Sequence, residues 1–120
     1  MVLVDTSVWI RHLREGDPQL TFLLVEGEVA VHPWVIGELA CGHLEPRDEI
    51  LSLLHALPVT AVLATDEYYR FLDTHLLAGR GLGFVDVHIL GAACLAQVPL
   101  WSHDRALRRA ALGMELSFRP

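Results

Sequence analysis

Short and almost wholly apolar segments alternate with longer segments of helical periodicity along this chain. The apolar segments are Val2–Val4, Val29–His32 and Val98–Trp101. Continuous apolar character, without alternation of apolar and polar residues, is typical of strands buried on both faces. Because parallel strands need crossover connections, the pattern predicts an α/β fold in which helices cover both faces of a mostly parallel central sheet.

Capping and breaking residues set the expected limits of the helices. Thr6 or Ser7 is expected to cap the first helix, and Pro33 is expected to open the helix that contains Glu38. Further helices are expected after Pro18, from Glu45-Pro46, from Thr65-Asp66 through Leu77, from Asp86 to Gln97, and after Asp104. Residues 58–62 are expected to form a short strand or an extended link, and residues 114–118 an edge strand.

Length and composition favour a single folded domain, residues 1–120. A hydrophobic content of 52% excludes a disordered chain, and no apolar stretch reaches the ~20 residues that span a bilayer. Asp5 interrupts the N-terminal apolar run, which is untypical of a signal peptide, so a cytoplasmic protein without membrane association is expected. Cys41 and Cys94 have apolar neighbours and no metal-binding spacing, and both are expected to be buried, reduced core residues.

Four acidic residues lie where such a fold could direct them to one edge of the sheet. Asp5 follows the first strand, Glu38 lies within a helix, and Asp86 and Asp104 stand at two helix starts. Ligands of open parallel sheets bind at the carboxyl ends of the strands. Two carboxylates ~5 Å apart repel each other by roughly 3 kcal/mol at an effective dielectric constant of ~20. Proteins that gather several carboxylates commonly neutralise them with Mg²⁺ or Mn²⁺, so a metal site is predicted.

A simpler role remains open for each acidic residue. Asp5, Asp86 and Asp104 could serve only as helix caps, because Asp is favoured at helix starts without any metal. Glu38 could be an ordinary exposed residue of its helix.

Four sequence blocks resemble the signature blocks of the PIN-domain nucleases. In chain order they read VLVDTSVW, GELA, FVDVHILGAA and VPLWSHDRAL. Their order and spacing, together with the chain length, resemble the VapC toxins of bacterial and archaeal toxin–antitoxin pairs. The resemblance covers essentially the whole chain and implies a three-layer PIN-like fold. Two features depart from many relatives: the segment between the second and third blocks is compact, and Leu107 stands where an aromatic residue is common.

The resemblance implies a Mg²⁺- or Mn²⁺-dependent endoribonuclease toxin that cleaves RNA phosphodiester bonds and is inhibited by a VapB-like antitoxin. The acidic residues of the family, which are catalytic and bind the metal, fall on Asp5, Glu38, Asp86 and Asp104. The hydroxyl side chains expected to orient these carboxylates and their waters are Thr6, Ser7 and Ser102. The resemblance also implies a homodimer.

All nine basic residues are arginines, and the net charge of −6 argues against non-specific duplex binding by the whole surface. A few arginines near the acidic residues could still contact RNA phosphates. Arg80 precedes Asp86 in a glycine-rich segment, and Arg105, Arg108 and Arg109 follow Asp104. Solvated helix faces explain each arginine taken singly.

Bulky apolar residues in the first helices have two interpretations. Trp9, Leu13, Phe22 and Trp34 are most simply core residues. The resemblance offers a second interpretation, in which an antitoxin segment lies in an apolar groove and directs a basic side chain to the acidic site.

Other functional classes fit the sequence less well. A receiver-like Mg²⁺-binding signalling domain needs a lysine near its phosphoryl group, and the chain contains none. A phosphatase with a DxD motif needs a second Asp where this chain has Ser7. A catalytically inactive PIN-fold binding module remains open, although four retained acidic residues argue against it.

Overall fold

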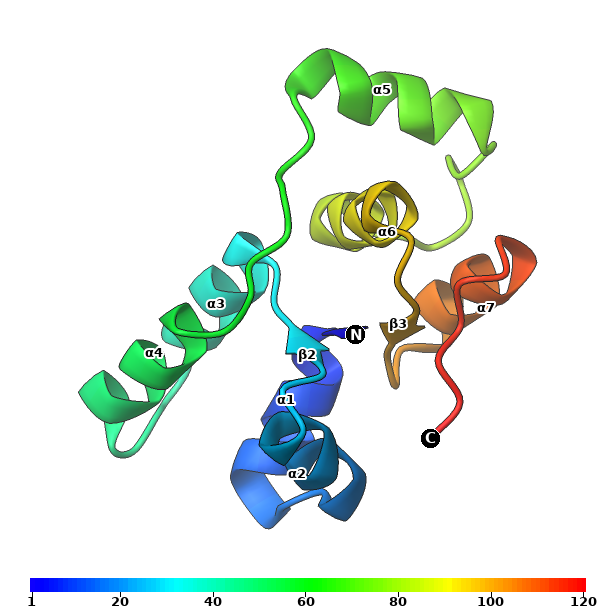
Figure 1. Cartoon of the computed structure of the whole chain (residues 1–120). Helices are drawn as coiled ribbons and strands as arrows, with labels where there is room; N and C mark the ends of the chain where they lie inside the picture. The colour runs from blue at the N-terminus through cyan, green and yellow to red at the C-terminus, as the bar shows by residue number, and fades with distance from the viewer.

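Three parallel strands form the centre of the protein in a computed structural model, which describes residues 1–120 (Figure 1). They are β1 (Val2–Val4), β2 (Val29–Ala30) and β3 (Leu100–Trp101), in the order β2-β1-β3. The strands are short, and all of their residues are buried. Parallel pairing with β1 in the middle confirms the sheet that the apolar segments predicted.

Seven helices surround this sheet. They are α1 (Thr6–Glu15), α2 (Pro18–Val25), α3 (Pro33–Ala40), α4 (Arg47–His55), α5 (Thr65–Thr74), α6 (Phe84–Ala96) and α7 (Arg105–Gly113). In Figure 1, α1 and α2 lie on one side of the strands, and α5 and α6 lie on the other. The predicted arrangement of a parallel sheet between helical layers is therefore confirmed.

Each edge of the sheet is extended by one isolated parallel bridge. Val31 pairs with Val59 on the β2 side, and Leu100 pairs with Ser117 on the β3 side. The expected edge strand at 114–118 is reduced to this bridge because Glu115 has a left-handed φ of 59°, which interrupts an extended run. On the other edge, Thr60 donates its N–H to the Val31 carbonyl oxygen at 3.0 Å.

Several expected helix caps were wrong. The N-cap of α1 is Asp5 instead of Thr6 or Ser7, and its side chain makes no capping hydrogen bond. The N-cap of α5 is Ala64, and α5 ends before Leu76, whose φ of 52° lies in the left-handed region. Helix α6 begins at Phe84, so Asp86 is the third residue of the helix and not its first.

Five apolar or thiol side chains are less buried than predicted, while Trp9 is buried as expected. Cys41 is exposed just after the end of α3, and Cys94 is only partly buried. The buried face of α2 is set by Leu20 and Leu23, which turns Phe22 toward solvent at 58% exposure. The other two are Leu13, which is 37% exposed, and Trp34, which is partly buried.

Helix α6 is the most deeply buried helix. None of the seven helices has the length and apolar character of a membrane span. Seven consecutive residues, 87–93, are buried. A Cβ atom added at Gly91 would lie 2.5 Å from the Leu63 side chain, so the missing side chain lets the segment before α5 approach α6 closely.

Removing the side chain of Leu90 should destabilise the protein strongly. Leu90 is fully buried on α6, and a buried Leu→Ala change leaves a cavity that costs roughly 2–5 kcal/mol. We expect the free energy of unfolding, measured by urea denaturation, to fall by that amount in Leu90→Ala. The matched control on the same helix is Leu95→Ala, at a side chain that is 63% exposed, and it should change stability by less than ~0.5 kcal/mol. Equal losses in the two variants would contradict the assignment of the core.

Candidate metal centre

Asp5 lies at the carboxyl end of β1, and two hydroxyl groups hold its side chain. Both Ser7 Oγ and Ser102 Oγ donate to the same atom, Asp5 Oδ2, at 2.7 Å each. The carboxylate is only 5% exposed, and a buried carboxylate is costly unless it accepts hydrogen bonds. The hydroxyls thus fix the Asp5 side chain, while its second oxygen, Oδ1, accepts no hydrogen bond from the protein.

The same hydroxyls attach the segment after β3 to the start of α1. Ser102 Oγ accepts a hydrogen bond from the Asp104 N–H at 2.9 Å, and Ser7 Oγ accepts one from the His103 N–H at 3.0 Å. The neighbouring strands β1 and β3 therefore end in one shared hydrogen-bond network. This network places Asp104 beside Asp5, although 99 positions of sequence numbering separate them.

Asp104 and Asp86 each cap the start of a helix with one carboxylate oxygen. Asp104 is the N-cap of α7, and its Oδ2 accepts a hydrogen bond from the Leu107 N–H at 2.9 Å. Asp86 Oδ2 accepts a hydrogen bond from the Gly83 N–H at 2.9 Å. The capping interpretation thus holds for both residues, but it occupies only one oxygen of each.

Glu38 is presented by α3, which packs against α1. Thr6 Oγ1, in the first turn of α1, donates to Glu38 Oε1 at 2.6 Å. The carboxylate is exposed to solvent, yet its direction is set by this hydrogen bond. Thr6 therefore orients the carboxylate of Glu38, as Ser7 and Ser102 orient that of Asp5.

A common pattern joins the four carboxylates, which we call the acidic rim (Asp5, Glu38, Asp86 and Asp104). In each, one oxygen accepts hydrogen bonds that orient the side chain, and the other accepts none from the protein. None of the four takes part in an ion pair with an arginine, a histidine or the N-terminus. Their charges are therefore not neutralised by the protein itself.

The electrostatics of Asp86 place the four carboxylates near one another. Burial is the largest influence and raises the pKa of Asp86, while the hydrogen bond from Gly83 lowers it. The charges of Asp5, Asp104 and Glu38 then raise the pKa of Asp86 further, in that order. Like charges destabilise an ionised carboxylate only at close range, so the four side chains share one rim of the protein.

The acidic rim fits a hard divalent cation in the chemistry of its donors. Its four unoccupied carboxylate oxygens are the ligand type that Mg²⁺ and Mn²⁺ prefer. As the side chains stand, no three Asp, Glu, His or Cys residues converge closely enough to hold one ion together. The rim is thus an open set of oriented carboxylates and not a closed ligand cage.

His32 lies at the start of α3 and was not predicted from the sequence to have a role in this region. It is fully buried, and its Nδ1 accepts a hydrogen bond from the Trp34 N–H at 3.0 Å, which caps the helix that carries Glu38. Burial, and to a smaller extent the nearby His88, lower the pKa of His32 to about 4. Histidine is an unusual N-cap, so capping preferences gave no signal for it.

Arginines border the acidic rim on the side of α7. Arg80, Arg105 and Arg109 line a hollow of about 560 Å³ together with Asp104. Arg108 lies on the neighbouring wall of α7, in a second hollow. The sequence pointed to Arg80, Arg105, Arg108 and Arg109 as possible phosphate contacts, but it gave no signal for Arg119, which lines the second hollow.

Comparison with known proteins agrees with this fold. Residues 2–112 match the PIN domain, so the chain belongs to the PIN-domain family. The resemblance of the four sequence blocks to this family is thereby confirmed.

Within the family the chain is similar to VapC proteins. It is 46% identical over 111 residues to Ribonuclease VapC32 of Mycobacterium tuberculosis, in strains CDC 1551 / Oshkosh and ATCC 25618 / H37Rv alike. The aligned part covers 92% of this chain and 90% of the relative. This similarity makes the chain a VapC-type member of the family.

Two crystal structures share the fold. PAE2754 from Pyrobaculum aerophilum has a TM-score of 0.66 at 19% identity, covering 91% of this chain and 83% of that one. FitAcB from Neisseria gonorrhoeae has a TM-score of 0.61 at 16% identity, covering 98% of this chain and 95% of that one. At these identities the similarity establishes the fold alone.

His32 should make the stability of the protein depend on pH. Its pKa of about 4 in the folded state lies below the ordinary value of 6.5, so the unfolded chain binds more protons between these pH values. The contribution of His32 is fully present above pH ~6.5 and is lost as the pH falls toward 4, by about 3 kcal/mol in total. Urea denaturation across this range should show a weaker pH dependence in His32→Asn, because Asn keeps a capping oxygen and cannot titrate.

The control for this prediction is His55→Asn, at an exposed position near the end of α4. It should retain the pH dependence of the unmodified protein. If His32→Asn and the unmodified protein lost stability in parallel between pH 6.5 and 4, the assigned role of His32 would be wrong.

Proposed function

We propose that the chain is a divalent-metal-dependent endoribonuclease of the VapC type, with the acidic rim as its active site. One observation carries the proposal: all four carboxylates of the rim are oriented through one oxygen and leave the other oxygen available. Helix capping alone would not require four such carboxylates on one rim. The similarity to a protein named a ribonuclease, at 46% identity, supports RNA as the substrate.

Each residue of the site has a proposed task. Asp5 and Asp86 bind the cation directly, and Asp104 binds it directly or through water. Glu38 holds a water or a second ion at the exposed side of the rim. Ser7 and Ser102 keep Asp5 in position by their hydrogen bonds to Oδ2, and Thr6 keeps Glu38 in position.

The tasks follow from what phosphodiester hydrolysis demands. When bound, a divalent cation activates the attacking water and offsets the negative charge that develops on the phosphoryl oxygens. The negative charges of Asp5, Asp104 and Glu38, which raise the pKa of Asp86, also attract a cation to the rim. The fixed hydroxyls hold the carboxylates ready, so little reorganisation is needed when ion and substrate arrive.

We propose that an antitoxin regulates the protein and that it binds in a hollow of the surface. Apolar side chains of α1, α2, α4 and the segment after α4 line a hollow of about 310 Å³, here called the apolar groove: Trp9, Leu13, Leu24, Ile50, Leu53, Leu54 and Leu57. Leu13 also lines an adjoining hollow of about 430 Å³ that reaches Glu38. A VapB-like helix in the groove could therefore direct a basic side chain along this path to the acidic rim.

Two further properties are proposed from family membership. We expect a homodimer, and the exposed apolar side chains Tyr69, Phe84 and Leu95 offer surface for one on α5 and α6. A substrate RNA also places the proposed site of action in the cytoplasm.

Asp5→Asn should remove RNA cleavage without unfolding the protein. Asn keeps the size of the side chain but loses the charge that holds the ion, so the rate of cleavage in Mg²⁺ or Mn²⁺ should fall by more than ~100-fold, beyond the ~10–100-fold typical of supporting residues. The rate is measured on a labelled single-stranded RNA, and circular dichroism checks the fold. The control Asp48→Asn changes an exposed carboxylate on α4 and should cleave normally.

Chelation of divalent ions by EDTA should stop cleavage by the unmodified protein, and added Mg²⁺ or Mn²⁺ should restore it. Full cleavage by Asp5→Asn, or by the unmodified protein in EDTA, would contradict the proposed mechanism. A folded protein that binds RNA and never cuts it would instead favour the inactive binding module.

Leu53→Glu should weaken inhibition by the antitoxin. Leu53 is 63% exposed in the apolar groove, and a carboxylate there would be buried without a partner when a helix docks. We expect the Kd for the product of a neighbouring antitoxin gene to rise by at least ~10-fold, as measured by calorimetry. The control Leu112→Glu changes a side chain on α7 that is also exposed, at 54%, and should leave the Kd unchanged. Equal weakening by both would place the antitoxin elsewhere.

A further inference from the structure

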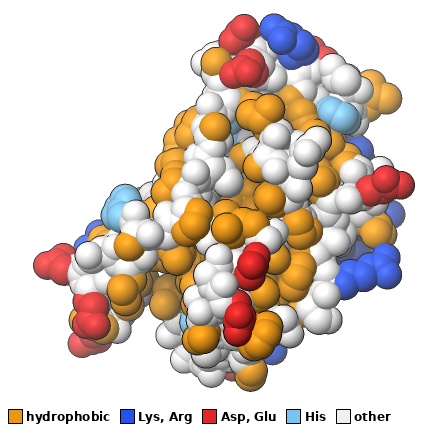
Figure 2. Space-filling model, in the orientation of Figure 1, with side chains coloured by type: hydrophobic (Ala, Val, Ile, Leu, Met, Phe, Trp, Pro, Cys, Tyr) orange, Lys and Arg blue, Asp and Glu red, His pale blue; other side chains and the backbone are white.

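Five of the nine arginines gather on one surface. This arginine strip consists of Arg80 before α6, Arg105, Arg108 and Arg109 on α7, and Arg119 near the C-terminus. In Figure 2, Arg side chains stand together at the edge of the molecule occupied by α7. The concentration is notable because the whole chain carries a net charge of −6.

No arginine of the strip takes part in an ion pair. The ion pairs of the protein engage Arg11 with Glu15 and Arg70 with Asp66, both outside the strip. Arg47 donates instead to backbone carbonyls at the end of α3. Five of the six arginines that have no ion pair or side-chain hydrogen bond therefore lie in the strip, and the sixth is Arg14. Such a group of like charges is an arrangement that an anionic ligand stabilises.

The strip lines two hollows that meet along α7. The first, of about 560 Å³, begins at Asp104 of the acidic rim and is bordered by Arg80, Arg105 and Arg109. The second, of about 410 Å³, lies between α7 and the C-terminal segment and is bordered by Arg108 and Arg119. Arg105 and Arg109 line both hollows, so the two hollows adjoin on α7.

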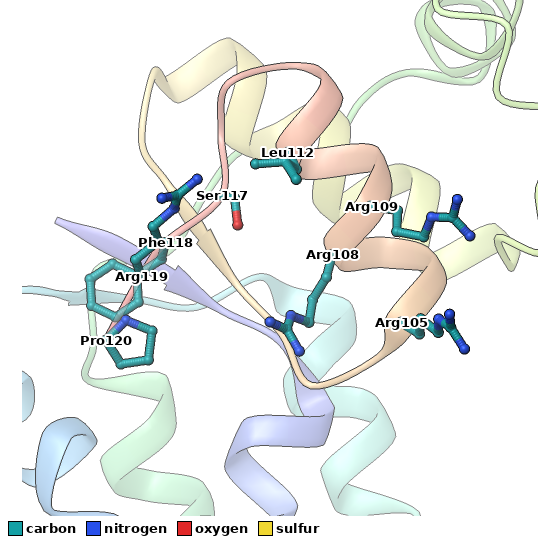
Figure 3. A pocket seen from close by; sticks show the side chains of 8 residues that line it. All are labelled: Arg105, Arg108, Arg109, Leu112, Ser117, Phe118, Arg119 and Pro120. Carbon is teal, nitrogen blue, oxygen red and sulfur yellow. The ribbon is translucent and has the colours of Figure 1, made fainter.

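Figure 3 shows how the second hollow is built. Arg105 and Arg109 point to one side of α7, and Arg108 points to the other, toward the segment that carries Ser117 and Arg119. Guanidinium groups thus stand on both walls, and the Ser117 hydroxyl lies between them as a neutral donor. Such a fork of donors suits phosphate oxygens, which Arg binds through two parallel hydrogen bonds.

We propose that the arginine strip holds the single-stranded RNA that flanks the scissile phosphate, so that the strand leaves the acidic rim at Asp104 and runs along α7 to Arg119. This inference rests on the proposed function, because it takes the rim as the place of cleavage. Single-stranded RNA is the substrate class that a narrow, positively charged path fits, since such paths follow one phosphate backbone. The acidic remainder of the surface confines the strand to this path.

Binding of RNA without cleavage tests the strip directly. The probe is a fluorescein-labelled single-stranded RNA of roughly 12 nucleotides, and its Kd for the full chain is measured by fluorescence anisotropy in EDTA between ~50 and ~200 mM salt. For Arg108→Ala/Arg119→Ala we expect the slope of log Kd against log salt to fall by about 1.4, which corresponds to two lost phosphate contacts on a single strand.

Two matched variants accompany it. Arg11→Ala/Arg70→Ala removes the same charge from arginines that are already ion-paired, and it should leave the slope unchanged. Arg108→Lys/Arg119→Lys keeps the charge and should keep most of the slope, which separates loss of phosphate contact from loss of folded structure.

An unchanged slope in Arg108→Ala/Arg119→Ala, or an equal fall in Arg11→Ala/Arg70→Ala, would overturn the proposed path. Binding of a duplex DNA with the same dependence on Arg108 and Arg119 would also overturn it, because the site would then be a general anion surface. Failure of the proposed path and failure of the proposed function give different results in this experiment. Arginine-dependent binding without cleavage in Mg²⁺ defeats only the nuclease proposal, whereas cleavage with arginine-independent binding defeats only the path.

Discussion

The hydrogen bonds that converge on Asp5 Oδ2 hold the functional end of this protein together. A carboxylate that is 95% removed from solvent would be strongly disfavoured without them, and Ser7 and Ser102 supply two short donors. Because Ser102 also accepts from the Asp104 N–H, the same hydroxyl joins β1, β3 and the start of α7. The short strands thus have side-chain support at the edge where they end, and this junction also fixes the backbone of Asp104.

The charges on either side of Asp104 have opposite sign. On one side the acidic rim repels any phosphate that lacks a cation to bridge it, and on the other side the arginines attract phosphate directly. A nucleic acid could therefore be drawn to α7 before it enters the rim, with the cation needed only at the point of cleavage. The division also explains how a chain with a net charge of −6 could bind a polyanion, since the surface that matters is locally basic.

The sequence predicted the sheet well because continuous apolar runs such as Val2–Val4 have few other uses in a chain of this size. It also marked the four carboxylates, and the structure gathers them on one rim, but sequence alone could not show which oxygen of each was already occupied. The cap of α1 was predicted wrongly because Thr6 and Ser7 use their hydroxyls for Glu38 and Asp5, contacts that local propensity does not encode. Arg119 had no signal at all, because only the folding of the C-terminal segment beside α7 brings it near Arg108.

Asp104 belongs to two parts of the structure, because it is the N-cap of α7 and a member of the acidic rim. Any event that turns its carboxylate would disturb the first turn of the helix on which three arginines stand. Occupancy of the rim and occupancy of the helix face would then be thermodynamically coupled, each changing the affinity of the other by the same factor.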